Sequence, residues 1–246
     1  MIPAIEIDER YLVRDSGTSD GTQIKYFMDN KWYKVDRYGG EGIAEELASI
    51  LLDNSNLPEG SYVKYKRFLI NNIEGCVSDN FLKKGESYIT FYRLYSNIYG
   101  KDLATVTSAM DYDDAIDYVL EFMQKNTGLD LREYLANTFA LDALILNEDR
   151  HFNNMGVIYD GRGFKPAPIF DNGKSLFIGN AGYDPDKTIE ENRRAAHAKA
   201  FSGSFDLNKD YLERYCSVRF NIDKVLEAIT DDNEVTHIFK GLINPL

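Results

Sequence analysis

The sequence predicts an α+β fold of two lobes, with a small β-rich lobe over residues 1–80 and a mostly helical lobe over residues 81–246. In the first part, short runs of β-branched and aromatic residues alternate with turn-forming residues, which is the pattern of strands and hairpins. From residue 111 onward, apolar residues recur at helical spacing. A polar stretch at residues 147–154 follows an apolar, helix-like run and carries the side chains that indicate a function.

Composition argues against several classes of protein. The 246 residues carry a formal net charge of −12, which disfavours direct nucleic-acid binding and is compatible with a basic protein as partner. A hydrophobic content of 43% and a charged content of 28% indicate a globular chain, long enough for two lobes around a cleft. No apolar run approaches the ~20 residues of a membrane helix, and no signal peptide is recognisable. Cys76 and Cys216 form no disulfide framework, so we expect a cytoplasmic protein with no membrane partner.

The first elements are predicted strands around a small, polar loop. Residues 5–13 form a predicted strand, and residues 24–28 and 31–35 form a predicted hairpin with a two-residue turn. The loop at residues 14–22 is rich in glycine and hydroxyl residues, and its backbone N–H groups could wrap phosphates. A plain surface loop is the alternative.

Lys34 and the helix that follows it form a candidate charge pair. The lysine lies in an aromatic strand, where it is either a solvated edge charge or a cation directed into a cleft. Apolar periodicity predicts a helix over residues 41–53. Glu45 and Glu46 on this helix are both candidate partners for the lysine, whereas Glu41 is expected to be solvated.

The elements that lead to the polar stretch are predicted from their periodicity. Strands are predicted over residues 62–70, 73–77 and 87–95, and helices over residues 111–127 and 131–146. Asp142 stands inside the second of these helices. It is either a buried anchor for the loop that follows, or part of an exposed helix face.

Three oxygen-bearing side chains converge at the end of a predicted hairpin, whose strands span residues 155–159 and 164–170. Counting outward from its turn, Asn154 and Asp171 fall opposite each other at the open end, and Asp149 lies just before it. One carboxylate could accept the proton of an attacking hydroxyl, while an amide and a second carboxylate could hold Mg²⁺ against nucleotide phosphates. The alternative is a polar loop that caps a helix, with these residues present for turn chemistry.

At these residues the chain resembles the HipA-like kinases, a family of bacterial toxin kinases, and more distantly the phosphatidylinositol kinases. Residues 149–154, DRHFNN, match the family's D-x-H-x-x-N, and Asp171 after an apolar strand matches its metal-binding aspartate. Residues 21–25, GTQIK, resemble its G-x-Q-x-K phosphate loop, and Thr18 stands where that loop carries a serine that can be autophosphorylated. The chain is short for the family and is expected to lack its usual N-terminal subdomain.

The resemblance implies a two-lobed protein-kinase-like fold and an ATP- and Mg²⁺-dependent kinase that acts on a Ser or Thr hydroxyl of a protein. Asp149 would be the catalytic base, Asn154 and Asp171 the metal ligands, and Lys34 the phosphate clamp. Leu-Pro at residues 57–58 resembles a pair that follows the same helix in the family. Counting back from it selects Glu45 as the partner of Lys34, so Glu46, like Glu41, is expected to be solvated.

The resemblance and the order of the chain also imply supporting residues. Asp142 and His151 would support the catalytic loop, the histidine by hydrogen bonds to loop carbonyls. The residues expected to contact the nucleotide are Gly21, Thr22, Gln23, Lys25, Lys34, Phe81 and Leu82. The loop hydroxyls expected to be autophosphorylated are Thr18 first, and then Ser16 and Ser19.

The implied partners are a protein substrate with an acceptor Ser or Thr and, in a toxin–antitoxin system, an antitoxin. Three alternatives stay open. The same fold could phosphorylate a small molecule or a lipid headgroup, or it could bind nucleotide as an interaction module without catalysis. The third alternative is a metal-dependent hydrolase that uses Asp149, His151, Asp171 and His197.

Overall fold

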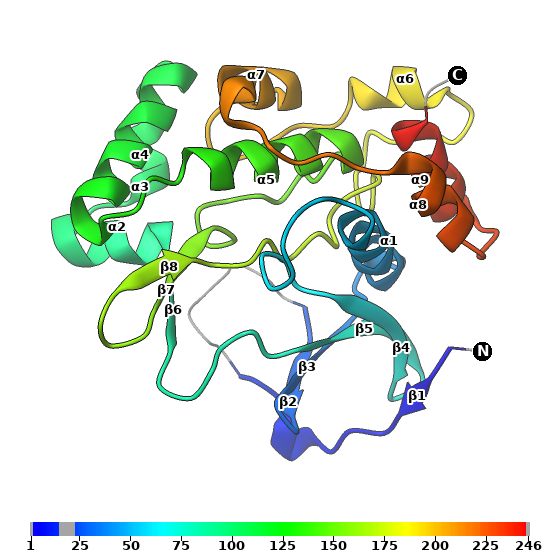
Figure 1. The fold of residues 1–246 in the computed structure, drawn as a ribbon. Helices are drawn as coiled ribbons and strands as arrows, with labels where there is room; N and C mark the ends of the chain where they lie inside the picture. The colour runs from blue at the N-terminus through cyan, green and yellow to red at the C-terminus, as the bar shows by residue number, and fades with distance from the viewer. Residues whose placement is uncertain (1, 15–22, 245–246) are drawn as a thin grey trace.

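The computed structural model of the protein describes residues 2–14 and 23–244. A β-rich lobe and a mostly helical lobe are evident in Figure 1, and this confirms the predicted two-lobed α+β fold. Five of the predicted site residues lie outside the described residues: Ser16, Thr18, Ser19, Gly21 and Thr22.

The β-rich lobe is built on a five-stranded sheet in the order β1-β4-β5-β3-β2. Its strands are β1 (Ala4–Ile5), β2 (Lys25–Met28), β3 (Lys31–Val35), β4 (Tyr65–Ile70) and β5 (Ile73–Asp79). Only β1 and β4 are parallel neighbours in this sheet. The two-residue turns at residues 29–30 and 71–72 have positive φ angles throughout, as type I′ hairpins require, and Asn and Asp tolerate this conformation.

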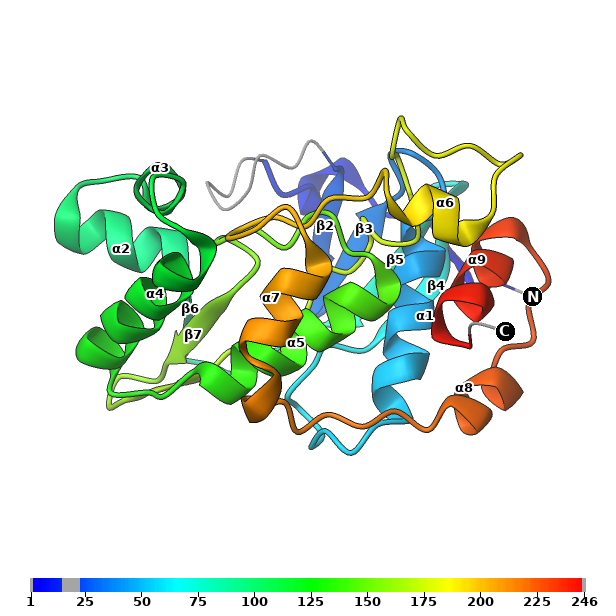
Figure 2. The same ribbon diagram turned by 90° about the horizontal axis from the view of Figure 1, so that it is seen from above.

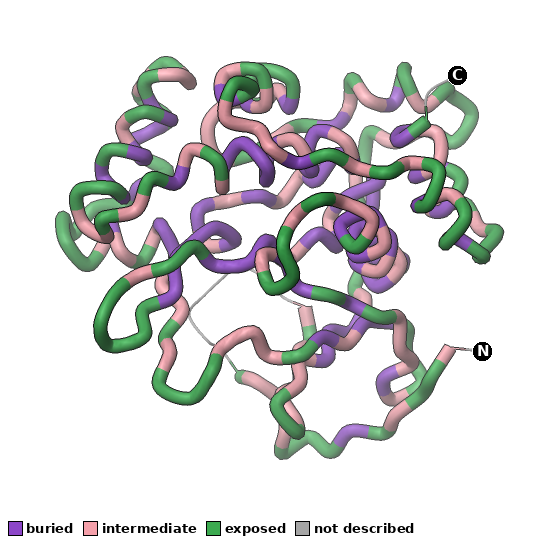
Figure 3. Tube along the Cα trace, in the orientation of Figure 1, coloured by how far each residue is buried: buried purple, intermediate pink, exposed green. Residues whose placement is uncertain are grey.

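Helix α1 (Glu41–Asp53) joins the two lobes, and its predicted bounds are confirmed. One side of α1 packs on β4 and β5, while another side contacts α8 (Ile222–Ala228) and α9 (Glu234–Ile243) of the helical lobe, as Figure 2 shows from above. Leu51 of α1 therefore shares a core with Phe239 of α9. In Figure 3 the buried residues follow α1 into the centre of the molecule. Because α1 is packed on both sides, we expect it to be a fixed element rather than a swinging one.

The helical lobe contains a second sheet, in the order β6-β7-β8, and the remaining helices. The strands are β6 (Ser87–Thr90), β7 (Gly156–Tyr159) and β8 (Phe164–Pro166). The helices, besides α8 and α9, are α2 (Phe91–Tyr99), α3 (Leu103–Thr107), α4 (Tyr112–Thr127), α5 (Arg132–Ile145), α6 (Ile189–Arg193) and α7 (Phe205–Tyr211). Within the described ranges, no helix combines the length and the apolar character needed to cross a bilayer.

Three predicted strands differ from the structure. The strand predicted over residues 164–170 ends at Pro166 as β8, and Ile169 beyond it pairs with Tyr62 of the other lobe. The strand predicted over residues 87–95 ends at Thr90, whose Oγ1 accepts a hydrogen bond from the backbone N–H of Arg93 and so caps α2. Gly100, in the left-handed conformation at φ 63°, ends the same helix. The aromatic residues between Thr90 and Gly100 have a high strand propensity, but the capping residues at both ends stabilise a helix instead. The strand predicted over residues 5–13 is reduced to β1 and a 3-10 turn.

Candidate active site

Lys34, Glu45 and Asp171 form an ionic cluster where β3, α1 and the segment after β8 meet. Lys34 Nζ lies 2.9 Å from Glu45 Oε1 and 2.5 Å from Asp171 Oδ1. Lys34 is 7% exposed and Glu45 is 1% exposed, so the lysine is not a solvated edge charge. The ammonium also lies 4.7 Å from the centroid of the Tyr65 ring, a favourable position for a cation. The structure thus brings together the lysine and the glutamate that the sequence paired.

The charges in this cluster shift one another's pKa values. Burial alone would lower the pKa of Lys34, but Asp171 and Glu45 outweigh burial and hold that pKa well above its usual value. Burial raises the pKa of Glu45, and Lys34 opposes the rise. Asp171 has the opposite balance, since Lys34 and Lys25 outweigh burial and lower its pKa. Asp171 is therefore ionised at neutral pH, the form that could serve as a hard oxygen ligand.

A close approach of two glycines places Glu45 beside Lys34. A Cβ atom on Gly42 of α1 would lie only 2.4 Å from the carbonyl oxygen of Gly75 in β5. The helix can therefore rest directly on the backbone of β5, which pairs with β3 through Cys76 and Lys34. Glu45 lies one turn beyond Gly42, so this contact brings its carboxylate within reach of the lysine.

The prediction that Glu41 is solvated is wrong. Glu41 is buried, and its Oε1 accepts hydrogen bonds from the backbone N–H groups of Arg37 and Tyr38. The chain before α1 turns back over the start of the helix, and its amides there need an acceptor. The same expectation for Glu46 is also wrong, because Glu46 is half-buried and its Oε1 accepts a hydrogen bond from the backbone N–H of Arg67.

Arg150 connects the predicted catalytic loop, residues 147–154, to α5 and to both neighbours of Asp171. Its buried guanidinium forms a two-point contact with Asp142, with Nε 3.0 Å from Oδ2 and Nη2 3.0 Å from Oδ1. Nη2 also donates to Asn172 Oδ1 at 2.7 Å, and Nη1 donates to the carbonyl of Phe170. Asp142 is thus a buried anchor and not part of an exposed helix face. Asp171 adopts a left-handed φ of 62°, and these contacts on either side hold it in that strained conformation.

Asn154 is fixed by the backbone of Asp149. Its Nδ2 donates to the Asp149 carbonyl at 2.9 Å, and because a carbonyl can only accept, this contact leaves Asn154 Oδ1 available to other partners. Asn154 and Asp171 line the same cavity, so an amide oxygen and a carboxylate are presented together. This donor set fits Mg²⁺, which proteins usually hold through one or two side chains plus phosphate oxygens and water.

Among the described residues, one carboxylate oxygen of Asp149 is paired and the other has no hydrogen bond. Oδ1 lies 2.5 Å from Lys199 Nζ, whereas Oδ2 lies 3.9 Å from His151 Nε2, which is too long for a hydrogen bond. The predicted hydrogen bonds from the His151 ring to loop carbonyls are not found in the part of the chain that the structure describes, where Nδ1 is buried without a partner. The loop closes instead through its own backbone, since the N–H of His151 donates to Asp149 and the N–H of Asn154 donates to His151.

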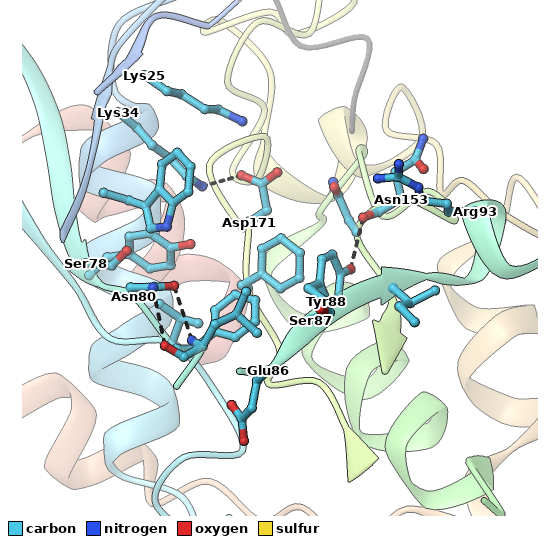
Figure 4. A pocket seen from close by; sticks show the side chains of 18 of the residues that line it. Lys25, Lys34, Ser78, Asn80, Glu86, Ser87, Tyr88, Arg93, Asn153 and Asp171 are labelled. Atoms are coloured by element: carbon cyan, nitrogen blue, oxygen red, sulfur yellow. Dashed lines mark hydrogen bonds and ion pairs between the residues drawn. The ribbon is translucent and has the colours of Figure 1, made fainter. Parts of the chain in front are cut away.

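A cavity of about 690 Å³ lies beside the ionic cluster, and Figure 4 shows the side chains that line it. Lys25, Lys34 and Asp171 lie close together at one part of this cavity. Elsewhere polar residues such as Asn80 and Arg93 share the lining with apolar ones, among them Phe81 and Phe170, whose ring centroids are 5.6 Å apart. A cavity that is charged in one part and aromatic in another suits a molecule with phosphates and a planar base.

The segment between the lobes is held by Asn80. Its Oδ1 accepts a hydrogen bond from the backbone N–H of Leu82 at 3.2 Å, and its Nδ2 donates to the Leu82 carbonyl at 3.3 Å. Phe81 and Leu82, which were predicted to contact the nucleotide, both line the cavity. A nucleotide base that formed hydrogen bonds with the backbone of Leu82 would compete with the side chain of Asn80 for the same groups. Of the residues predicted to contact phosphates, Gln23 and Lys25 are described, and Lys25 lines the cavity whereas Gln23 does not.

Sequence reasoning missed two contacts at this site. Asn80 was not singled out, because an asparagine after a strand is an ordinary turn residue. Lys199 was not singled out either, because it is 50 residues beyond Asp149 and no local pattern relates the two. For the hydrolase alternative, the described residues contain no group of three or more His, Cys, Asp and Glu side chains that could hold a metal ion.

The two lobes and the residues gathered between them define a protein with a kinase-like fold. No protein-family model and no curated protein matches the chain. Among solved structures, the proinflammatory kinase CtkA of Helicobacter pylori matches with a TM-score of 0.61 and 15% identity over 92% of this chain and 87% of that chain. At this low identity, the match shows that the two proteins share a fold and shows nothing about a shared activity. A chain of the Shewanella oneidensis HipA–HipB toxin–antitoxin complex with its operator DNA also matches, at a TM-score of 0.46 and 9% identity over 95% of this chain and 61% of that chain.

Proposed function

We propose that the protein is an ATP- and Mg²⁺-dependent phosphotransferase that acts on a Ser or Thr hydroxyl of a protein. The observation that carries the proposal is the arrangement around the cavity. The buried cation Lys34 is held by Glu45 and Asp171 at the cavity, and Asn154 lines the same cavity. Asp149 lies on the adjoining loop, and neither Asn154 Oδ1 nor Asp149 Oδ2 has a hydrogen bond from the described residues. A positioned base, a clamp for phosphate and two oxygen ligands are what phosphoryl transfer requires.

Each described residue has a distinct part in this proposal. The apolar lining, including Val63 and Phe81, would receive the base, and the Lys34 ammonium would bind phosphate oxygens while Glu45 keeps it in place. Asn154 Oδ1 and the carboxylate of Asp171 would hold Mg²⁺, which neutralises the charge that develops on the phosphates.

The transfer step then needs only one proton acceptor from the protein. The acceptor hydroxyl would give its proton to Asp149 Oδ2, and its oxygen would bond to the γ-phosphorus as the bond from that phosphorus to the bridging oxygen breaks. ADP would leave with the electron pair of the broken bond. An antitoxin partner stays a prediction from the motif resemblance.

The test is incubation of the protein with a cell lysate and ATP labelled at the γ-phosphate, with Mg²⁺ or with EDTA. We expect Mg²⁺-dependent label on Ser or Thr of a protein, and none when the label is on the α-phosphate. Label that appears in lipid or in small molecules would favour the alternative acceptors. ATP binding without any transfer would favour the interaction module, and no ATP binding at all would contradict the proposal.

A further inference from the structure

Lys199 is an active-site cation to which neither the sequence motifs nor the kinase-like arrangement gives a role. Its ammonium lies 2.5 Å from Asp149 Oδ1, and it belongs to the segment between α6 and α7. Lys199 does not line the nucleotide cavity among the residues that the structure describes. Its contact is therefore with the proposed base and not with the lining of that cavity.

The segment before Lys199 is tied to the residue next to the base. The carboxylate of Glu148 accepts a hydrogen bond from the backbone N–H of His197 at 2.9 Å and another from Asn180 Nδ2 at 2.8 Å. Asn180 Nδ2 also donates to the carbonyl of Ala195 at 3.1 Å. Glu148 therefore fixes the approach of this segment to the catalytic loop.

The segment after Lys199 is tied to the same loop from the other side. The ring of Phe201 lies 5.3 Å from that of Phe152, which is three residues beyond Asp149, in an edge-to-face arrangement. Ala200, which lies between Lys199 and Phe201 in the sequence, has a left-handed φ of 79°. A residue other than glycine rarely adopts this backbone conformation without supporting contacts. Lys199 is thus held between two anchors, and both anchors use residues of the catalytic loop.

A contribution to folding stability does not explain the ion pair of Lys199 with Asp149. The Lys199 side chain is 51% exposed and that of Asp149 is 33% exposed, and ion pairs in such settings contribute little to folding because water screens them. The geometry has a different consequence. Lys199 occupies Oδ1 and leaves Oδ2, for which the described residues provide no hydrogen bond, as the one oxygen open to an acceptor hydroxyl.

We propose that Lys199 is a positioning residue for the phosphoryl-transfer step: it holds the Asp149 carboxylate so that Oδ2 meets the acceptor hydroxyl. This inference rests on the proposed function. During the step, the proton moves from the acceptor hydroxyl to Oδ2 while the ion pair at Oδ1 is kept. The carboxylate of Asp149 then cannot rotate away from the acceptor.

The test compares Lys199→Ala, Lys199→Arg and Lys187→Ala with wild type in the Mg²⁺-dependent labelling assay, at varied ATP. Lys187 is a matched control, because it forms an exposed pair with Asp184 at 3.2 Å in the loop before α6. We expect Lys199→Ala to lower the maximal rate by at least ~10-fold, but by less than the ~10²–10⁴-fold expected for loss of the base itself. The ATP concentration for half-maximal rate should stay within about twofold of wild type, since Lys199 lies outside the nucleotide cavity.

Two further readouts separate positioning from folding. Lys199→Arg should retain most of the wild-type rate, because arginine can keep the ion pair with Asp149. Lys187→Ala should have the wild-type rate. The melting temperatures of all variants should lie within about 4 °C of that of wild type. An unchanged rate in Lys199→Ala would overturn the inference, and so would a raised rate, which would make Lys199 an inhibitory contact. A raised ATP requirement with an unchanged maximal rate would overturn it in favour of a nucleotide contact. Wild type without transfer would contradict the proposed function itself.

Discussion

Replacing Lys34 tests how the ionic cluster is built. Lys34→Met keeps the length and apolar stem of the side chain but removes the ammonium that pairs with Glu45 and Asp171. Glu45 is 1% exposed, and among the described residues its carboxylate would retain the backbone N–H of Asn172, at 2.9 Å, as its one partner. Removing one partner of a buried ion pair typically costs about 3–5 kcal/mol, because the other charge stays buried without compensation. We therefore expect the free energy of unfolding of Lys34→Met to be about 3–5 kcal/mol lower than that of wild type at pH 8.

This cost should depend on pH in a known direction. Burial already raises the pKa of Glu45, and loss of Lys34 removes the main opposing effect, so the pKa in the folded variant must rise further above its unfolded value. A group with a raised folded pKa contributes stability that is fully present below the unfolded pKa, about 4.3 for Glu, and is lost as the pH rises through the folded pKa. The penalty of Lys34→Met should therefore be larger at pH 8 than at pH 5.

The assay is urea unfolding followed by circular dichroism and by the fluorescence of Trp32, which is the sole tryptophan and lies on the same strand. Lys31→Met is the matched control on β3, since its pair with Asp79 is exposed and should contribute at most about 1 kcal/mol. Adding Glu45→Gln to Lys34→Met removes the stranded charge and should recover part of the loss. A Lys34→Met protein within about 1 kcal/mol of wild type at pH 8 would refute the account of a buried, mutually dependent pair.

Three further predictions concern the metal site, the seating of α1 and the loop before β2. Asp171→Asn removes an anionic metal ligand, so calorimetry should show that Mg²⁺ no longer strengthens ATP binding; an unchanged Mg²⁺ effect would reject this ligand. Gly42→Ala would place a Cβ against the Gly75 carbonyl and should cost about 1–3 kcal/mol and lower the rate, while Gly163→Ala, with open space around it, should do neither. Thr18 should be phosphorylated when the protein is incubated with ATP, with loss of activity, because the added charge of about −1.5 to −2 repels ATP; mass spectrometry and turnover of the modified protein test both parts.

Periodicity and turn chemistry predicted much of the fold from the sequence. The bounds of α1 follow from its apolar spacing, and the hairpin ahead of it follows from an Asp-Asn turn that tolerates positive φ. The failure at residues 87–95 has a local cause. Aromatic residues there favour strand, and only the Thr90 cap with the glycine at position 100 shows that a helix begins.

The ionic site was less predictable, because local sequence patterns do not reveal which side chains are buried or which distant residues form pairs. Glu41 was taken for a solvated residue, but its carboxylate bonds backbone amides that turn back over α1. The sequence left open whether Lys34 is a solvated edge charge. It is buried, and the contact of Gly42 with Gly75 that seats α1 beside its strand joins segments far apart in the chain. The contact of Lys199 with the catalytic loop likewise depends on a segment whose path only the structure gives.

The central claim, that Asp149 is the base of a phosphotransferase, is tested most directly by measuring ATP binding and phosphate transfer on one preparation of Asp149→Asn. Asn154 bonds the backbone carbonyl of residue 149 and not its carboxylate, so the substitution leaves the proposed metal ligands in place. We predict Mg²⁺-dependent ATP binding within about twofold of wild type and a transfer rate lower by about 10²–10⁴-fold, as for loss of a general base. Transfer by Asp149→Asn at a near wild-type rate would contradict the account.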